Sequence, residues 1–260
     1  MSLLDTPVGF AGERKALAIS CLAFYAAFYG LVSFIFYMAP PDQPEMRAWV
    51  PAFLALCATY GVAFFALAAD WFWARWFAVG LGYSGVTVAV WGMVSQQSID
   101  QVLLFYGVTH GLITVSLQGQ KLTHHFDGQP SWRQWLRISD EQSVEKIRHT
   151  VTRAAASLPT LILFALSPRE AKGALLLLVG LGLFGVLRNR TAGVLLLLGA
   201  SVCIPFALLH MHEPETLQTG SLLAAWTTPV RLHGFAGFSG LLLLWATWPF
   251  LQPMLRHVRR

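Results

Sequence analysis

The sequence is poor in charge. Only 12% of its 260 residues are Asp, Glu, Lys or Arg, whereas 55% are hydrophobic, and the mean hydropathy is +0.55. Soluble domains carry about twice this share of charged residues. The composition therefore excludes an ordinary soluble domain and predicts that lipid is the natural solvent of most of the chain.

Cysteine is also scarce. Cys21, Cys57 and Cys203 are odd in number and far apart in the sequence. This spacing excludes a disulfide framework and a CxxC metal site. We expect the three thiols to serve as buried apolar groups.

Long stretches of the chain lack any charged residue. The stretches that reach the roughly 20 residues needed to cross about 30 Å of hydrocarbon are 16–41, 48–69, 76–99, 101–120, 191–212 and 232–255. Two shorter apolar stretches, 154–168 and 173–187, flank a charged turn at 169–172. We interpret both as spanning, because a re-entrant hairpin would bury the charges of that turn in hydrocarbon.

The sequence thus predicts an all-α, polytopic integral membrane bundle of about eight transmembrane helices. We expect an N-terminal half (1–117), a cytoplasmic loop with an interfacial amphipathic helix (118–152) and a C-terminal half (153–260). The expected spans are about 16–39, 48–70, 75–97, 101–117, 153–167, 172–188, 191–211 and 232–252. The capping-box spacing of Ser139 and Gln142 predicts that the fifth helix begins near Asp140.

Basic residues predict the orientation of these helices. With a cytoplasmic N-terminus, fourteen of the 18 Lys and Arg residues fall on the inner side, which the positive-inside rule favours. Both termini are then cytoplasmic, and a bacterial inner membrane is the expected location. The net charge of +5 suits contact with anionic lipid, and we expect no nucleic-acid partner.

Polar side chains form one stripe on each of two expected helices. Residues four apart lie on one face of a helix, and such a stripe should face protein rather than lipid. The members expected to serve as packing or ligand groups are Tyr25, Tyr29, Ser33, Tyr106, His110 and Thr114. Tyr29 and His110 should lie at the same depth, which predicts a hydrogen bond between the first and fourth helices.

His110 is the deepest ionisable residue of the expected spans. A neutral histidine that a tyrosine or a carbonyl satisfies would serve helix packing. A ligand for haem, metal or substrate is the alternative. The expected helix interiors contain no carboxylate, which disfavours a proton relay.

A second candidate site lies near the outer surface. His210, His212 and Glu213 follow the seventh span, and His233 begins the eighth. Imidazole and carboxylate groups suit zinc, and imidazole with nearby methionine suits copper. Interfacial polarity without a metal is the other interpretation.

Glycines mark expected helix contacts. Gly107 and Gly111 form a GxxxG pair on the fourth helix, and Gly237 and Gly240 lie on the eighth. The runs 82–85 and 237–240 each resemble the GxSG motif of rhomboid proteases over four residues. The HxxxN motif that this family carries in an early helix is missing, so we do not expect an intramembrane serine hydrolase.

The short loops and the lack of a catalytic motif favour a non-catalytic subunit or assembly partner of a larger membrane complex. A haem- or metal-binding redox or metal-handling protein, using His110 or the outer histidines, is the first alternative. A carrier for a small neutral or lipid-like solute is the second.

Overall fold

The protein is a bundle of long helices. The computed structural model describes residues 8–40, 44–97, 99–127, 141–167, 173–209 and 229–258, and no strand occurs among them. Within this part of the chain the helices are α1 (Val8–Tyr37), α2 (Pro44–Ala48), α3 (Val50–Ala68), α4 (Ala74–Gln96), α5 (Gln101–Ser116), α6 (Gln120–Asp127), α8 (Glu141–Ala165), α9 (Gly173–Leu187), α10 (Thr191–Leu209) and α12 (Pro229–Val258). The all-helical, polytopic membrane fold is confirmed.

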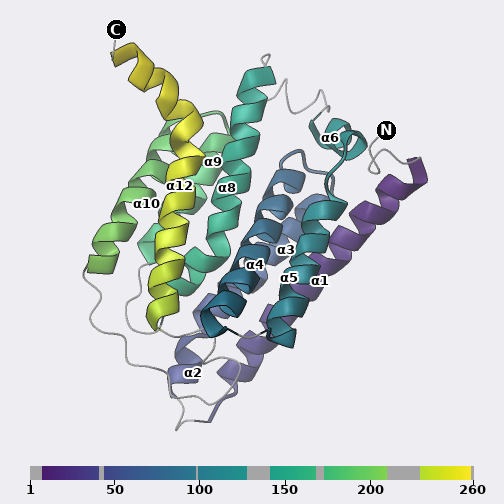
Figure 1. The fold of residues 1–260 in the computed structure, drawn as a ribbon, viewed down its shortest axis with the longest axis vertical. Helices are drawn as coiled ribbons and strands as arrows, with labels where there is room; N and C mark the ends of the chain where they lie inside the picture. Colours follow the sequence, from purple (N-terminus) through teal and green to yellow (C-terminus); the bar gives the residue numbers. More distant parts are fainter. Residues whose placement is uncertain are drawn as a thin grey trace.

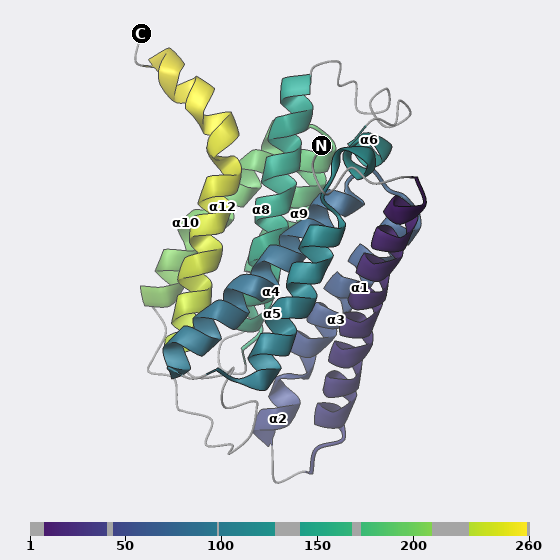
Figure 2. The same ribbon diagram turned by 45° about the vertical axis from the view of Figure 1, so that its right-hand side comes forward.

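The long helices run up and down along one common axis (Figure 1). The first residue of α1 and the last of α12 lie at the same end of the bundle, here called the terminus end, and α2 lies at the opposite end (Figures 1 and 2). In the first half α1 packs on α3 and α5, and α4 packs on α5; in the second half α8 packs on α12, and α10 packs on α9 and α12. The main contact between the halves joins α4 to α8.

Five helices of the described chain are long and apolar enough to cross a membrane. They contain Gly12–Tyr37, Met46–Ala68, Ala74–Ser95, Thr191–Leu208 and Gly234–Gln252. A sixth crossing results if α5 and α6, which meet at a 71° bend, count as one span. The apolar helix α9 is shorter, with 15 residues.

The helix ends follow from local chemistry. Asp100 caps α5, because its carboxylate accepts hydrogen bonds from the backbone N–H groups of Val102 (2.7 Å) and Leu103 (3.1 Å). Left-handed residues follow three other helices: Asp70 after α3, Gln97 after α4 and Asn189 after α9. Asp and Asn tolerate this conformation better than most residues, so a helix can end at Asp70 or Asn189 with little backbone strain.

Candidate functional site

Aromatic side chains from three helices meet inside the first half of the bundle. We call this group the tyrosine–histidine cluster: Tyr25 and Tyr29 from α1, Tyr60 from α3, and Tyr106 and His110 from α5. All five residues are buried, and His110 is fully enclosed. The His110 ring lies 4.2 Å from the Tyr25 ring and 4.1 Å from the Tyr106 ring, measured between centroids.

Hydrogen bonds determine the tautomer of His110. Its Nδ1 lies 2.8 Å from the Tyr106 carbonyl oxygen, which can only accept, so Nδ1 carries the proton. Because full burial disfavours the charged imidazolium, Nε2 carries no proton and accepts a hydrogen bond from the Tyr60 hydroxyl at 2.7 Å. The ring is therefore neutral, with both nitrogens engaged.

Two further hydrogen bonds join α1 to α5. Tyr29 and Tyr106 share one between their hydroxyls at 3.1 Å. The Tyr25 hydroxyl donates to Thr109, because the Thr109 hydroxyl proton is directed to the carbonyl oxygens of its own helix, 2.8 Å away on Phe105. The expected link between the first and fourth helices is thus present, but it does not use His110, whose partner comes from α3.

The remaining stripe residues lie outside this cluster. Ser33 is buried and donates to the Val50 carbonyl at 3.4 Å, which connects α1 to the start of α3. The Thr114 hydroxyl bonds to the His110 carbonyl of its own helix at 3.3 Å. Both groups stabilise packing.

Small residues on α4 admit the imidazole. A Cβ atom added to Gly85 would lie 2.0 Å from His110 Cγ, and one added to Gly82 would lie 2.2 Å from the Thr114 hydroxyl oxygen. The His110 and Thr114 side chains of α5 therefore occupy the space that Gly85 and Gly82 leave on α4. The run 82–85 is thus a packing surface.

The four glycines that the sequence singled out differ in their surroundings. An added Cβ would lie 2.9 Å from the Ala89 Cβ at Gly107, 3.8 Å from Val86 at Gly111 and 3.5 Å from Ile204 at Gly240. At Gly237 it would meet nothing within 4 Å. Gly107 is therefore a close contact between α4 and α5, whereas Gly237 lies on an open face.

The expected outer metal site falls largely outside the described residues. His210, His212 and Glu213 lie there, and of His233 only the backbone in α12 is described. Among the residues that the structure describes, no three His, Cys, Asp or Glu side chains are placed to hold a metal ion. The outer site therefore stays a prediction.

Charged residues gather at the terminus end of the bundle. Asp127, the last residue of α6, is buried and accepts a hydrogen bond from the Trp76 indole at 2.8 Å. Its other oxygen lies 3.5 Å from the Arg148 guanidinium of α8 and 3.8 Å from that of Arg75 on α4. These contacts tie α6 to both halves of the bundle.

Asp70 forms a second ionic contact at this end. Lys15 of α1 donates to its carboxylate at 2.7 Å, and His125 Nε2 of α6 donates at 2.9 Å. Burial acts to raise the pKa of Asp70, but the hydrogen bonds from Lys15 and His125 outweigh burial and hold this pKa below its ordinary value of 3.8. The carboxylate is thus ionised at neutral pH.

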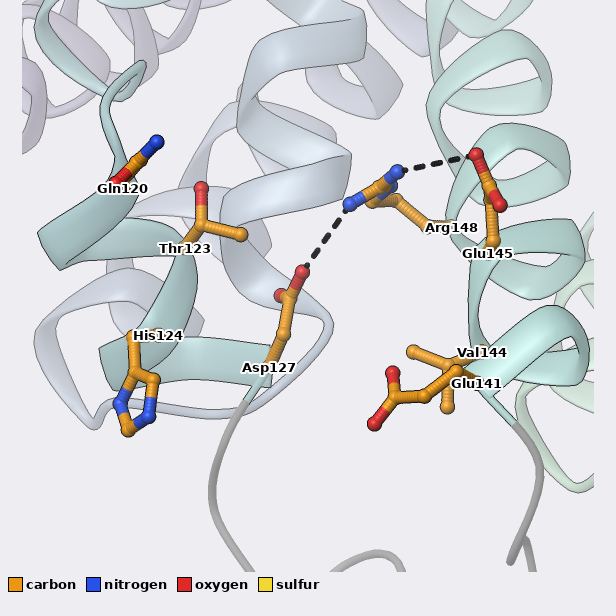
Figure 3. Close-up of a pocket in the computed structure, with 8 residues that line it drawn as sticks. All are labelled: Gln120, Thr123, His124, Asp127, Glu141, Val144, Glu145 and Arg148. Carbon is orange, nitrogen blue, oxygen red and sulfur yellow. Dashed lines mark hydrogen bonds and ion pairs between the residues drawn. The ribbon is translucent and has the colours of Figure 1, made fainter.

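A polar cavity of about 640 Å³ opens between α6 and α8 at the same end. Figure 3 shows Asp127 facing Arg148 across it, with Glu145 on the far side of Arg148. Its lining residues are Gln120, Thr123, His124, Asp127, Glu141, Val144, Glu145 and Arg148. Both signs of charge are present and largely paired, so the wall stabilises the contact between α6 and α8.

Comparison with models of known families, with characterised proteins and with solved structures found no match. The chemistry of the chain has to be inferred from its own residues.

Proposed function

We propose that the chain is a non-catalytic subunit or assembly partner of a larger membrane complex, with eight spanning helices and both termini on the cytoplasmic side of a bacterial inner membrane. The observation that carries this proposal is the closed hydrogen bonding of the tyrosine–histidine cluster. His110 uses Nδ1 on the Tyr106 carbonyl and Nε2 on the Tyr60 hydroxyl. A histidine whose two ring nitrogens are both hydrogen-bonded in this way holds α5 against α3.

A haem or metal ligand at His110 fits this geometry less well. The Nε2 lone pair that a metal needs already accepts a hydrogen bond from the Tyr60 hydroxyl, and the ring is fully enclosed by protein. Ligation would require breaking this hydrogen bond and opening the contact with Gly85.

A partner helix has places to bind. Small residues let helix backbones approach each other in lipid. Among the glycines at which an added Cβ would meet nothing within 4 Å are Gly61, Gly180, Gly199 and Gly237. Outward-facing glycines on α3, α9, α10 and α12 support a role in which further helices pack on the bundle.

Isolation of the tagged full chain, in mild detergent and at native expression level, tests this function. We expect a second membrane protein at fixed stoichiometry, and Gly180→Leu and Gly61→Leu should weaken the association because the added side chains separate the backbones. Val94→Leu on α4, at an exposed position that is not glycine, is the matched control.

A chain that is isolated alone and fully stable, at native expression, would contradict the proposal. A visible absorption band or near-stoichiometric copper, zinc or iron, lost in His110→Ala or His210→Ala, would replace it with the redox or metal function.

A further inference from the structure

Arg153 lies where α8 changes from charged to apolar. Glu145, Arg148 and His149 precede it, whereas 154–165 carry no charge. Trp245 and Trp248 of α12 are about half exposed. Tryptophan side chains on the lipid face favour the level of the lipid headgroups, and α8 packs directly on α12. Arg153 therefore lies at a membrane boundary, whichever leaflet this boundary faces.

The Arg153 guanidinium is held in place. Its central carbon lies 4.0 Å from the centroid of the Trp245 ring, and Nη1 donates to the Trp245 carbonyl at 2.9 Å. One turn earlier, the Thr150 hydroxyl donates to the Ala246 carbonyl at 2.7 Å, so the same turns of α8 and α12 are joined twice. This arrangement orders a long side chain before any ligand binds.

Unlike Arg148 on the same helix, Arg153 has no carboxylate partner among the described residues. Lys15 pairs with Asp70, and Arg148 pairs with Asp127 and Glu145. Within the same part of the chain, Arg153 makes one hydrogen bond, to a carbonyl, and no ion pair. Guanidinium carries five N–H donors, so most of its hydrogen-bonding capacity remains for an anion.

We infer that Arg153, together with the ring of Trp245, binds the phosphate group of a phospholipid on the surface where α8 meets α12. A guanidinium matches two phosphate oxygens at once, and such charge-assisted bonds are stronger than neutral ones. Lipid phosphates are the anions that occur at this depth. The half-exposed Trp248 lies about one turn nearer the terminus end than Trp245, on the headgroup side of this site. The inference is independent of the proposed function.

Native mass spectrometry of the detergent-purified full chain, titrated with phosphatidylglycerol, tests the site. The wild type should bind one lipid more tightly than the rest. R153Q should weaken this binding about tenfold or more, because it removes a charge-assisted contact. R153K should fall between the two, because it keeps the charge and loses the planar fork. R47Q is the matched control, since Arg47 also donates to a carbonyl, that of Ala39, but at a different place.

Unchanged lipid binding in R153Q, or an equal loss in R47Q, would overturn the inference. A parallel titration with inorganic phosphate separates the two sources of the anion. Phosphate binding that is lost in R153Q, without any loss of lipid binding, would exclude the phospholipid. If R153Q does not fold, R153K still tests the site. Its ammonium can donate to the Trp245 carbonyl and so keep the contact between α8 and α12, and its lipid binding should still be weaker than that of the wild type.

Discussion

His110 is held between one neighbour that can only accept a hydrogen bond and another that can donate one. The Tyr106 carbonyl accepts a hydrogen bond from Nδ1, which places the proton there, and the Tyr60 hydroxyl donates a hydrogen bond to Nε2. Since the ring has no exposed surface, water cannot replace either partner. Loss of one partner therefore leaves an unsatisfied polar atom inside the bundle.

Tyr60→Phe should destabilise the protein. The variant keeps the ring but removes the donor to Nε2, which should lower the free energy of unfolding by about 1–2 kcal/mol. Equilibrium unfolding of the detergent-purified protein in SDS measures the difference. Tyr83→Phe is the control, because Tyr83 is half exposed and its loss of a hydroxyl should cost little. Equal stability of Tyr60→Phe and the wild type would show that the hydrogen bond is not maintained.

Gly85→Ala should be more harmful than Gly61→Ala. The new Cβ would lie 2.0 Å from His110 Cγ at Gly85, whereas at Gly61 it would meet nothing within 4 Å. We expect a loss of about 2 kcal/mol or more at Gly85 from overpacking, and at Gly61 no loss, because alanine is the better helix former. The same unfolding assay compares them, and a tolerated Gly85→Ala would mean that α4 and α5 pack less closely.

The sequence could predict which residues of the cluster are interior but not how they pair. The spacing of Tyr25, Tyr29, Tyr106 and His110 places them on two helix faces, and all four are buried. Tyr60 has no such stripe on α3, so periodicity gave no reason to choose it as the partner of His110. Pairing depends on the relative rotation and depth of three helices, which packing determines.

At the scale of elements, α8 is the central helix of the described bundle. It packs on α4 in one half and on α9 and α12 in the other. Its small residues allow this position: Gly80 of α4 lies so close that an added Cβ would be 2.3 Å from the Thr152 carbonyl oxygen and 2.7 Å from the Ala155 Cβ. On its other side, Thr160 shares a hydrogen bond with Ser239 of α12 at 2.8 Å.

The start of α8 shows what local signals can predict. The capping-box residues predict a start near Asp140, and the helix is described from Glu141. The first helix begins earlier than hydropathy predicts, at Val8 instead of residue 16, because Glu13, Arg14 and Lys15 continue it beyond the apolar stretch. Lys15 then reaches Asp70, a contact between residues 55 positions apart that no local pattern reveals.

The Asp70 contact should make the link between α1 and α6 sensitive to acid. The folded protein holds the pKa of Asp70 below 3.8, so it binds this proton less readily than the unfolded chain does. The contact therefore stabilises the fold fully above pH 3.8, and this contribution is lost as the pH falls through the lower, folded-state pKa.

Unfolding of the wild type and of Asp70→Asn between pH 3 and pH 7 measures this effect. The stability difference between them should be constant near neutral pH and shrink at the acidic end. Lys15→Met provides the matched background. In it, Asp70→Asn should lower the free energy of unfolding by less, because the main cation that pairs with Asp70 has been removed. A difference that stays constant down to the lowest pH would show that the carboxylate is not stabilised by its partners.

For the whole molecule, the two shortest apolar segments decide the topology. Six crossings result from the five helices that are long and apolar enough by themselves and from the bent pair of α5 and α6, counted as one span. Eight crossings also require α8 and α9, of which α9 has 15 residues. In Figures 1 and 2, α8 runs between the two ends of the bundle, and α9 packs on α8 and α10.

Cysteine labelling distinguishes eight crossings from six. In a variant without Cys21, Cys57 and Cys203, we expect Lys172→Cys to react with a membrane-impermeant maleimide added outside intact cells. Arg190→Cys, which follows α9, should react only after permeabilisation. Arg260→Cys should behave as Arg190→Cys does, because the positive-inside rule places it in the cytoplasm.

Protection of Lys172→Cys from both sides, or its reaction only from inside, would favour a re-entrant hairpin and six crossings. Such a hairpin would expose Arg169, Glu170 and Lys172 to hydrocarbon, at about 2.5–3.5 kcal/mol for each charged residue at the bilayer centre. Spanning avoids this cost, because basic side chains at both ends of a short helix can reach the headgroups. The energy difference is larger than any single contact of the cluster provides, which is why we expect α8 and α9 to cross.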